Sequence, residues 1–245
     1  MNNTIQIIPL TNLMLSFLPG VVVIAILFKW RMDYRNAIYA AARMLLQLLL
    51  IGYFLTYLFQ SDSGLIVSLV LVVMLIASAL IALRTSGKNR ARLFPRMLVA
   101  LTLGCGLTLG LVTQGVLELS PWYAPRFMIP LAGMIFANSL NSISLAVERL
   151  IAELEREVPF EEARGIAFRT SLIPIINSLF AVGLVSLPGM MTGQILSGIS
   201  PLIAVRYQIM VMTMVFGSTG ISTAVFLVLI QPLFPSNEPD TAEPT

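Results

Sequence analysis

Long runs of apolar residues with few or no charges recur along the chain. An α-helix needs about 20 such residues to cross a hydrocarbon layer about 30 Å thick. Seven runs approach or reach this length, at residues 10–28, 38–59, 64–83, 97–117, 127–147, 172–187 and 207–230. The pattern predicts an all-α fold, a polytopic membrane helix bundle of about seven transmembrane helices.

The sixth run is the shortest and ends at Pro188-Gly189. The segment after it, residues 190–201, could extend the helix with a kink or fold back as a re-entrant turn. Irregular backbone at membrane depth is tolerated only where protein or a water-filled cavity covers it. The sequence leaves both conformations open.

Basic residues lie on one side of the predicted spans. If the N-terminus is outside, only Arg126 and Arg206 of the 15 Lys and Arg residues fall on the outer side, which leaves 13 inside. Cytoplasmic loops of membrane proteins carry an excess of Lys and Arg. We therefore predict a multi-pass protein of the cell (inner) membrane with its N-terminus out and its C-terminus in.

The composition agrees with this prediction. The chain of 245 residues is 57% hydrophobic and 11% charged, whereas a soluble domain carries about 25% charged residues. One transmembrane domain at residues 1–231 is expected, with a disordered acidic tail at 232–245 that lacks Lys and Arg. The single cysteine, Cys105, excludes an intrachain disulfide.

Several kinds of chemistry are disfavoured by missing residues. The chain has no histidine, which removes zinc-hydrolase and Ser-His-Asp arrangements. It has no G-x-x-x-x-G-K-[ST] loop to cradle ATP, and no acidic residue within the seven runs to couple transport to protons or sodium. We expect no enzyme activity, no cofactor bound by this chain and no nucleic-acid partner; ATP, if used, would bind a partner subunit.

The segment 147–170 is the most charged loop and reads as two short amphipathic helices broken at Pro159. Its acids outnumber its bases by six to four (Glu148, Glu153, Glu155, Glu157, Glu161, Glu162 against Arg149, Arg156, Arg164, Arg169). Helices that lie on a bilayer favour Lys and Arg instead. We therefore prefer docking on a partner ATPase to a bilayer-surface helix, through Glu157, Phe160, Glu161, Ala163, Arg164 and Ala167.

Polar side chains inside the spans are candidates for a transport path, because burying them in lipid is costly. Arg43 and Gln47 lie one helical turn apart, although Arg43 could instead snorkel to the inner interface. The amides Asn138, Asn141 and Asn177 could line a hydrophilic path or simply bond one helix to another.

The cluster Pro188, Gly189, Met190, Met191 and Gly193 is a further path candidate. A Pro-Gly break frees backbone carbonyls that can coordinate an ion. The thioethers of Met190 and Met191 would favour a soft metal ion. A structural kink with space-filling methionines is the alternative.

Several strings resemble the FetB-type ABC transporter permeases, a family of bacterial iron-export and plant aluminium-sensitivity permeases. They are Arg43-Met-Leu-Leu-Gln47 with Ile51-Gly-Tyr53, Ile129-Pro-Leu-Ala-Gly-Met-Ile135, Ser171-Leu-Ile-Pro174, Val182-Gly-Leu-Val-Ser-Leu-Pro-Gly-Met-Met-Thr-Gly193 and Ala204-Val-Arg-Tyr-Gln-Ile-Met210. One departure is Glu157-Val-Pro-Phe160, where the family usually carries a Leu-Gly-Ala-Thr-like stretch.

The resemblance implies a permease subunit that exports metal ions and pairs with a separate ATP-binding subunit. Seven spans form a small bundle, so we expect a homodimer in the lipid bilayer with two ATPases. The alternative is a passive membrane channel or scaffold protein that is not coupled to ATP. In that case the charged segment 147–170 would be only a connector.

Overall fold

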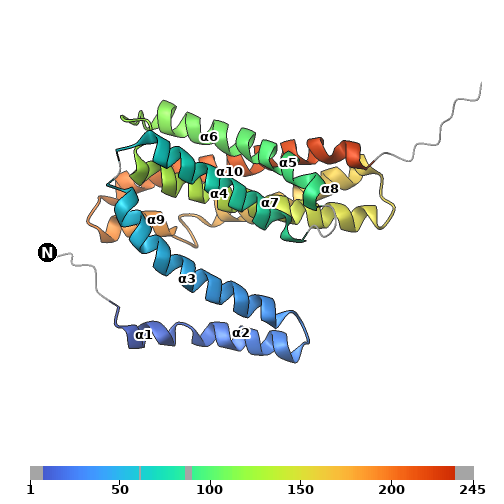
Figure 1. Ribbon diagram of the computed structural model, residues 1–245, viewed down its shortest axis with the longest axis horizontal. Helices are drawn as coiled ribbons and strands as arrows, with labels where there is room; N and C mark the ends of the chain where they lie inside the picture. The colour runs from blue at the N-terminus through green and yellow to red at the C-terminus, as the bar shows by residue number, and fades with distance from the viewer. Residues whose placement is uncertain (1–7, 61, 86–89, 235–245) are drawn as a thin grey trace, which may run out of the picture. The chain divides into compact units, whose positions relative to one another are not determined.

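A computed structural model of the chain describes residues 8–60, 62–85 and 90–234. Within those ranges all regular structure is helical, apart from one isolated bridge between Val182 and Ser186 (Figure 1). The predicted all-α fold is therefore confirmed. The chain divides into two compact units, Met1–Ser61 with Leu196–Gly198 (unit 1) and Asp62–Ile195 with Ile199–Thr245 (unit 2).

Unit 1 contains helices α1 (Leu10–Leu15), α2 (Leu18–Lys29) and α3 (Tyr34–Leu58). The turn before α3 is fixed by Asp33, whose side chain accepts a hydrogen bond from the Asn36 amide at 3.1 Å, as expected of an N-cap. The rings of Phe28 and Tyr34 meet edge to face, with centroids 5.2 Å apart, and join the end of α2 to the start of α3.

Unit 2 contains α4 (Gly64–Ala82), α5 (Arg90–Leu101), α6 (Leu107–Gly110), α7 (Pro125–Leu154), α8 (Phe160–Ala181), α9 (Gly189–Leu196) and α10 (Pro201–Ile230). A wide π-helical turn at Thr102–Gly106 joins α5 and α6 into one rod, and a second at Leu111–Val116 extends the rod beyond α6. α4, α7 and α10 run in one direction, and the α5–α6 rod and α8 run in the other (Figure 1).

Six helical stretches of the described residues are long and apolar enough to cross a membrane: Leu10–Lys29, Tyr34–Leu58, Gly64–Ala82, Ala91–Val116, Pro125–Leu154 and Pro201–Leu233. Each overlaps one predicted span. The prediction of about seven helices is therefore close, and the difference lies in the run 172–187.

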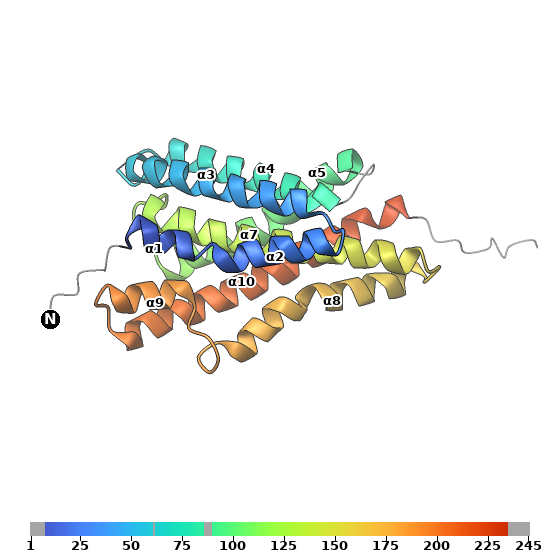
Figure 2. The ribbon, with the colours of Figure 1, turned by 90° about the horizontal axis from the view of Figure 1, so that it is seen from below.

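The run 172–187 does not form one continuous helix, and this corrects its predicted bounds. α8 ends at Ala181 because Val182 is extended (φ −63°, ψ 130°) and Gly183 takes a left-handed φ of 83°. Gly183 N donates to Ser186 O at 3.0 Å and closes a tight turn. The short helix α9 follows, and the chain reverses direction before α10 (Figure 2).

The core of unit 2 is built on α7 and α10. α7 packs against α4, α8 and α10, so most of its circumference is covered. Most of the largest fully buried side chains of unit 2 come from α5, α7 and α10 (Met97, Leu101, Leu131, Ile135, Ile143, Leu150, Met214, Phe226, Leu227, Ile230).

The two ends of unit 2 differ in charge. One end is where α4 leads into α5, α7 leads into α8, and α10 stops; we call it the basic end. Within about three turns of it lie most of the described arginines of unit 2 (Arg84, Arg90, Arg92, Arg96, Arg149, Arg156, Arg164, Arg169). Only Arg126 and Arg206 lie at the other end. Which membrane side the basic end faces stays a prediction.

Gly104 lets the π-helical turn Thr102–Gly106 approach α10 closely. A Cβ atom on Gly104 would lie 2.5 Å from the backbone N and 2.8 Å from the Cα of Ser222. Those distances are too short for any side chain, because backbone atoms cannot give way as a flexible side chain can. Gly110, on the same rod, has open space where its Cβ would lie.

Replacing Gly104 with Ala should therefore destabilise the protein by about 1–3 kcal/mol through overpacking. Thermal unfolding of the detergent-purified chain measures this as a lower melting temperature. Gly110→Ala is the matched control and should leave the melting temperature unchanged or slightly raised, because Ala favours helix. Equal effects of the two substitutions would contradict the close approach.

Candidate functional site

The turn between α7 and α8 is closed by a Schellman motif at the basic end. Val158 N donates to Glu153 O at 3.2 Å, and Glu157 N donates to Leu154 O at 3.0 Å. Glu157 takes a left-handed φ of 62°, a conformation that favours glycine. The break predicted at Pro159 is present, but the two amphipathic stretches are the ends of long helices rather than separate short ones.

A buried carboxylate lies beside this turn. Glu153 is only 3% exposed, and its Oε1 is paired with Arg149 and lies 3.8 Å from Nη1 of Arg156. A buried charge is tolerated when it is paired. The two arginines therefore hold the last turn of α7 in place while their own side chains reach the surface, with 42% and 72% exposed.

The start of α8 is tied to the end of α10 by the α8–α10 clasp, which consists of Phe160, Glu161, Arg164, Gln231 and Phe234. Arg164 donates to Glu161 and to Oε1 of Gln231 (3.3 Å), and Gln231 Nε2 donates to Oε1 of Glu161 (3.1 Å). The Phe160 and Phe234 rings stack with centroids 6.0 Å apart. Phe234 thus belongs to the ordered bundle, although the predicted tail began at 232; residues 235–245 lie outside the described part of the chain.

α5 holds the same end of α10 from another side. Arg96 Nε donates to the carbonyl oxygen of Leu229 at 3.0 Å. The last carbonyls of a helix lack partners within the helix, and a cation there also interacts favourably with the helix dipole. Two helices, α5 and α8, therefore fix the C-terminus of α10.

Part of the predicted docking set is not accessible. Phe160, Ala163 and Ala167 are 7%, 0% and 0% exposed and lie in the core of unit 2. This corrects their assignment to a partner surface. An apolar stripe on a helix indicates only that the stripe is covered, and here the bundle itself covers it. Glu157 and Glu161 are exposed and Arg164 is half-buried, so these three keep their predicted role as a hypothesis.

The three amides predicted along the path all lie on the surface of unit 2. Asn138 and Asn141 on α7 and Asn177 on α8 are exposed, and Asn138 donates to a carbonyl of its own helix at 2.8 Å. The Ser142 hydroxyl donates to the carbonyl oxygen of Ser171 at 3.1 Å and fixes the register of the antiparallel pair α7 and α8. That register places Asn177 near the level of Asn138.

The Pro-Gly break opens α9. The carbonyl of Pro188 accepts the first helical hydrogen bond of α9 from Thr192 N at 3.0 Å, which occupies one of its two lone pairs. Met191 is buried, Met190 is half-buried and both Gly189 and Gly193 are exposed. Among the described residues no three Cys, Asp or Glu side chains gather into a metal site. A metal contact at Met190 and Met191 stays a prediction.

Arg43 and Gln47 are exposed on α3 within unit 1. They lie one turn apart on the same face of the helix, as the sequence spacing requires. A role for them in the transport path stays a prediction.

The sequence profile of one family matches residues 10–164 and 157–234, which together cover nearly the whole chain. The chain belongs to the UPF0014 family. That family is described as an uncharacterised protein family, and three relatives carry the words "membrane protein" in their names.

Three relatives illustrate the range of this UPF0014 group. A UPF0014 membrane protein of Synechocystis sp. is 37% identical over 76% of this chain and 78% of its own. The "Probable iron export permease protein FetB" of Escherichia coli is 33% identical over 88% and 89%. The "Protein ALUMINUM SENSITIVE 3" of Arabidopsis thaliana is 32% identical over 87% and 84%. The resemblance noted in the sequence is confirmed. No solved structure matches this UPF0014 chain.

Sequence reasoning missed a polar seam inside this UPF0014 bundle, formed by Cys105, Ser139, Ser142, Ser222 and Thr223. The Cys105 thiol lies 3.3 Å from the Ser139 hydroxyl and 3.5 Å from that of Ser222. The Thr223 hydroxyl donates to that of Ser142 at 3.0 Å. The signal in the sequence was the repeat of Ser-Thr pairs four residues apart, which puts four hydroxyls on one face of α10 (Ser218, Thr219, Ser222, Thr223).

Glycine at position 157 should stabilise the α7–α8 turn. Glu157→Gly removes the steric cost of a left-handed conformation, and we expect about 1 kcal/mol of added stability, read as a higher melting temperature. Glu155→Gly is the matched control, because Glu155 has a helical φ of −64°. It should lower the melting temperature through the flexibility of glycine. The same sign for both substitutions would contradict the Schellman geometry.

Proposed function

We propose that this chain is the permease subunit of an ABC transporter, embedded in the cell (inner) membrane, and that two copies work with two separate ATP-binding subunits to export metal ions. The similarity to the "Probable iron export permease protein FetB" of E. coli, at 33% identity over nearly nine-tenths of both chains, is the observation that carries the proposal. The apolar helices, the missing ATP-binding loop and the charged α7–α8 turn support it.

The α7–α8 turn is the part of the basic end best suited to receive an ATPase. Its exposed residues are mostly acidic (Glu155, Glu157, Glu161, Glu162). The Schellman motif and the paired Glu153 hold the turn rigid, and the α8–α10 clasp joins it to α10. A movement imposed on this turn would therefore reach α10, which carries one side of the polar seam.

The exposed amides provide a second element of the proposal. Amide oxygens suit hard metal ions and thioethers suit soft ones. Asn138, Asn141 and Asn177 lie on adjacent helices at similar depth, whereas Met190 and Met191 lie on α9. An iron-like ion passing the amides would meet oxygen ligands without being held tightly, as conduction requires.

Co-expression with candidate ATP-binding subunits tests the proposal. The chain would be tagged at its C-terminus, purified in detergent, and assayed for co-purifying ATPase and for ATP hydrolysis with and without added Fe²⁺. We expect an ATPase to co-purify in equal stoichiometry and Fe²⁺ to raise its turnover. If no ATPase associates, the chain is a channel or scaffold that does not use ATP.

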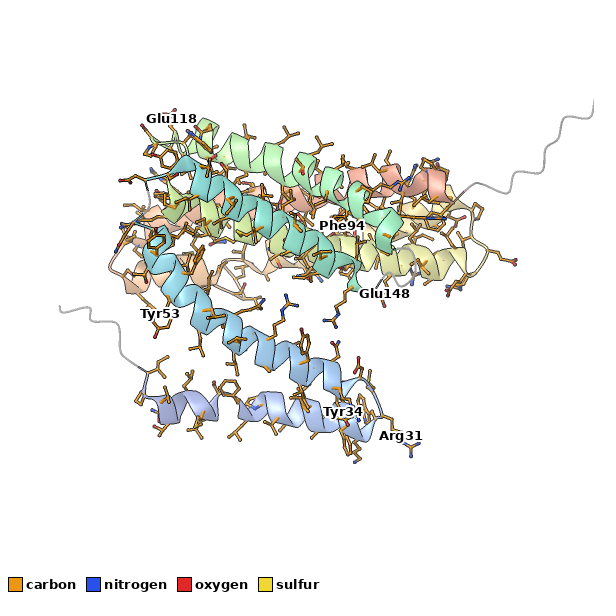
Figure 3. The ribbon with its side chains drawn as sticks, in the orientation of Figure 1. Arg31, Tyr34, Tyr53, Phe94, Glu118 and Glu148 are labelled. Atoms are coloured by element: carbon orange, nitrogen blue, oxygen red, sulfur yellow. The ribbon has the colours of Figure 1, made fainter. Side chains whose placement is uncertain are left out.

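Reversing charges on the turn should weaken this association. The double variant Glu155→Lys with Glu162→Lys changes two exposed side chains outside the α8–α10 clasp, and we expect binding of the ATPase to fall by about tenfold at low salt. Pull-down across a titration of the ATPase measures it. Glu118→Lys is the matched control, because Glu118 is exposed toward the opposite end of unit 2 from Glu148 (Figure 3). Unchanged binding of the double variant would place the contact elsewhere.

A further inference from the structure

The turn between α8 and α9, Val182–Pro188, exposes three large apolar side chains. Leu184 is 90% exposed, Val185 is 84% exposed, and Leu187 is also exposed. The turn lies within residues 170–205, which contain no charged residue. Exposed apolar side chains that gather in a patch, unlike single ones, mark a contact with a membrane or with another protein.

Charged residues on α7 indicate where the hydrocarbon layer begins and ends. Arg126 and Glu148 are exposed, and the helix between them carries no charge. That stretch is about 30 Å long at about 1.5 Å per residue, which is the thickness of a hydrocarbon core. Counted from the hydrogen bond between Thr223 and Ser142, the exposed Arg206 of α10 lies at nearly the same level as Arg126. We call the level of these two arginines the far boundary.

The α8–α9 turn begins just inside the far boundary. The hydrogen bond from Ser142 to the carbonyl of Ser171 sets the level of α8 against the antiparallel α7. By that register Ala181, the last residue of α8, is level with Ala132, which is about 9 Å inside the level of Arg126. α9 then continues toward the far end (Figure 2). Segments that lie in a membrane interface bury their apolar side chains about 5–10 Å into the boundary between headgroups and acyl chains.

The backbone of the turn suits this depth. Each amide of residues 182–186 donates to a carbonyl of the turn or of the last turn of α8, at 2.8–3.2 Å. Gly183 bonds to Ser186, and the other four amides bond to Ser178 or Ala181. An amide without a partner is costly near lipid. These donors need no water, so the turn can place its side chains among acyl chains.

We propose that the α8–α9 turn is an interfacial contact with lipid, in which Leu184, Val185 and Leu187 lie among the acyl chains just inside the far boundary. Lipid fits better than a second protein, because protein contacts within membranes favour small and hydrogen-bonding side chains, whereas the tip of this turn is Leu184 and Val185. The turn carries no charge, so the contact is with acyl chains rather than with a particular headgroup. The inference requires only that the chain spans a bilayer.

A fluorescent label at the tip of the turn tests this placement. Leu184→Cys would be made in a Cys105→Ser background, where Ser preserves the contacts with the neighbouring hydroxyls. The full-length chain would be labelled with the environment-sensitive dye NBD and reconstituted into phosphatidylcholine vesicles that contain spin-labelled lipids. We expect a nitroxide at the fifth acyl carbon to quench the dye about twice as strongly as one at the twelfth, because interfacial segments lie about 5–10 Å deep.

Two matched positions calibrate the measurement. Leu107→Cys is 66% exposed near the middle of the rod, so its label should be quenched more strongly by the deeper nitroxide. Glu155→Cys is exposed on the α7–α8 turn, so its label should be quenched by iodide in the water and only weakly by either lipid. Val185→Cys, at the adjacent exposed position, repeats the test if Leu184→Cys fails to fold.

The other outcomes identify what else covers the turn. Iodide quenching at position 184 equal to that at position 155 would place the turn in water and overturn the inference. A label at 184 that is shielded from both iodide and lipid nitroxides would also overturn it, since protein would then cover the turn. In that case a disulfide-linked dimer of unlabelled Leu184→Cys would identify a second copy of the chain as the cover, and its absence would indicate another segment of the same chain.

Discussion

Hydrocarbon offers no hydrogen-bond partner, so a polar group within the bundle is stabilised by a partner in the protein. The long helices satisfy their own backbone, and several hydroxyls return to carbonyls one turn earlier, as Ser78, Thr113 and Ser144 do. At the break between α8 and α9 the turn bonds to itself through Gly183 and Ser186. The polar seam obeys the same requirement between helices.

This requirement also explains the side-chain bonds between helices at the basic end of unit 2. The carbonyls at the C-terminus of α10 have no partner in their own helix. Arg96 reaches the carbonyl of Leu229, and Gln231 joins Glu161 and Arg164 of α8. Helix ends that are held by charged side chains move as one piece, whereas the opposite end of α8 leads into a loop. Side-chain contacts therefore join α5, α8 and the end of α10 where an ATPase is proposed to act.

The sequence was sufficient for the fold class and for six of the spans, because a run of about 20 apolar residues in lipid has few alternatives to a helix. It was less informative about whether an apolar helix face is covered by the bundle itself or by a partner protein. Phe160, Ala163 and Ala167 have the pattern of a docking face, but periodicity cannot tell whether the bundle or a partner covers them. The end of α8 at Ala181 depends on the left-handed Gly183, which hydropathy does not register. The polar seam was missed because single serines and threonines barely change hydropathy.

Cys105 gives this arrangement a practical consequence. The only thiol of the chain has no exposed surface and lies between the hydroxyls of Ser139 and Ser222. Thiol reagents can reach it only when the rod carrying α5 and α6 separates from α7 and α10. The rate at which the wild-type protein is alkylated therefore measures how often the bundle opens at its centre.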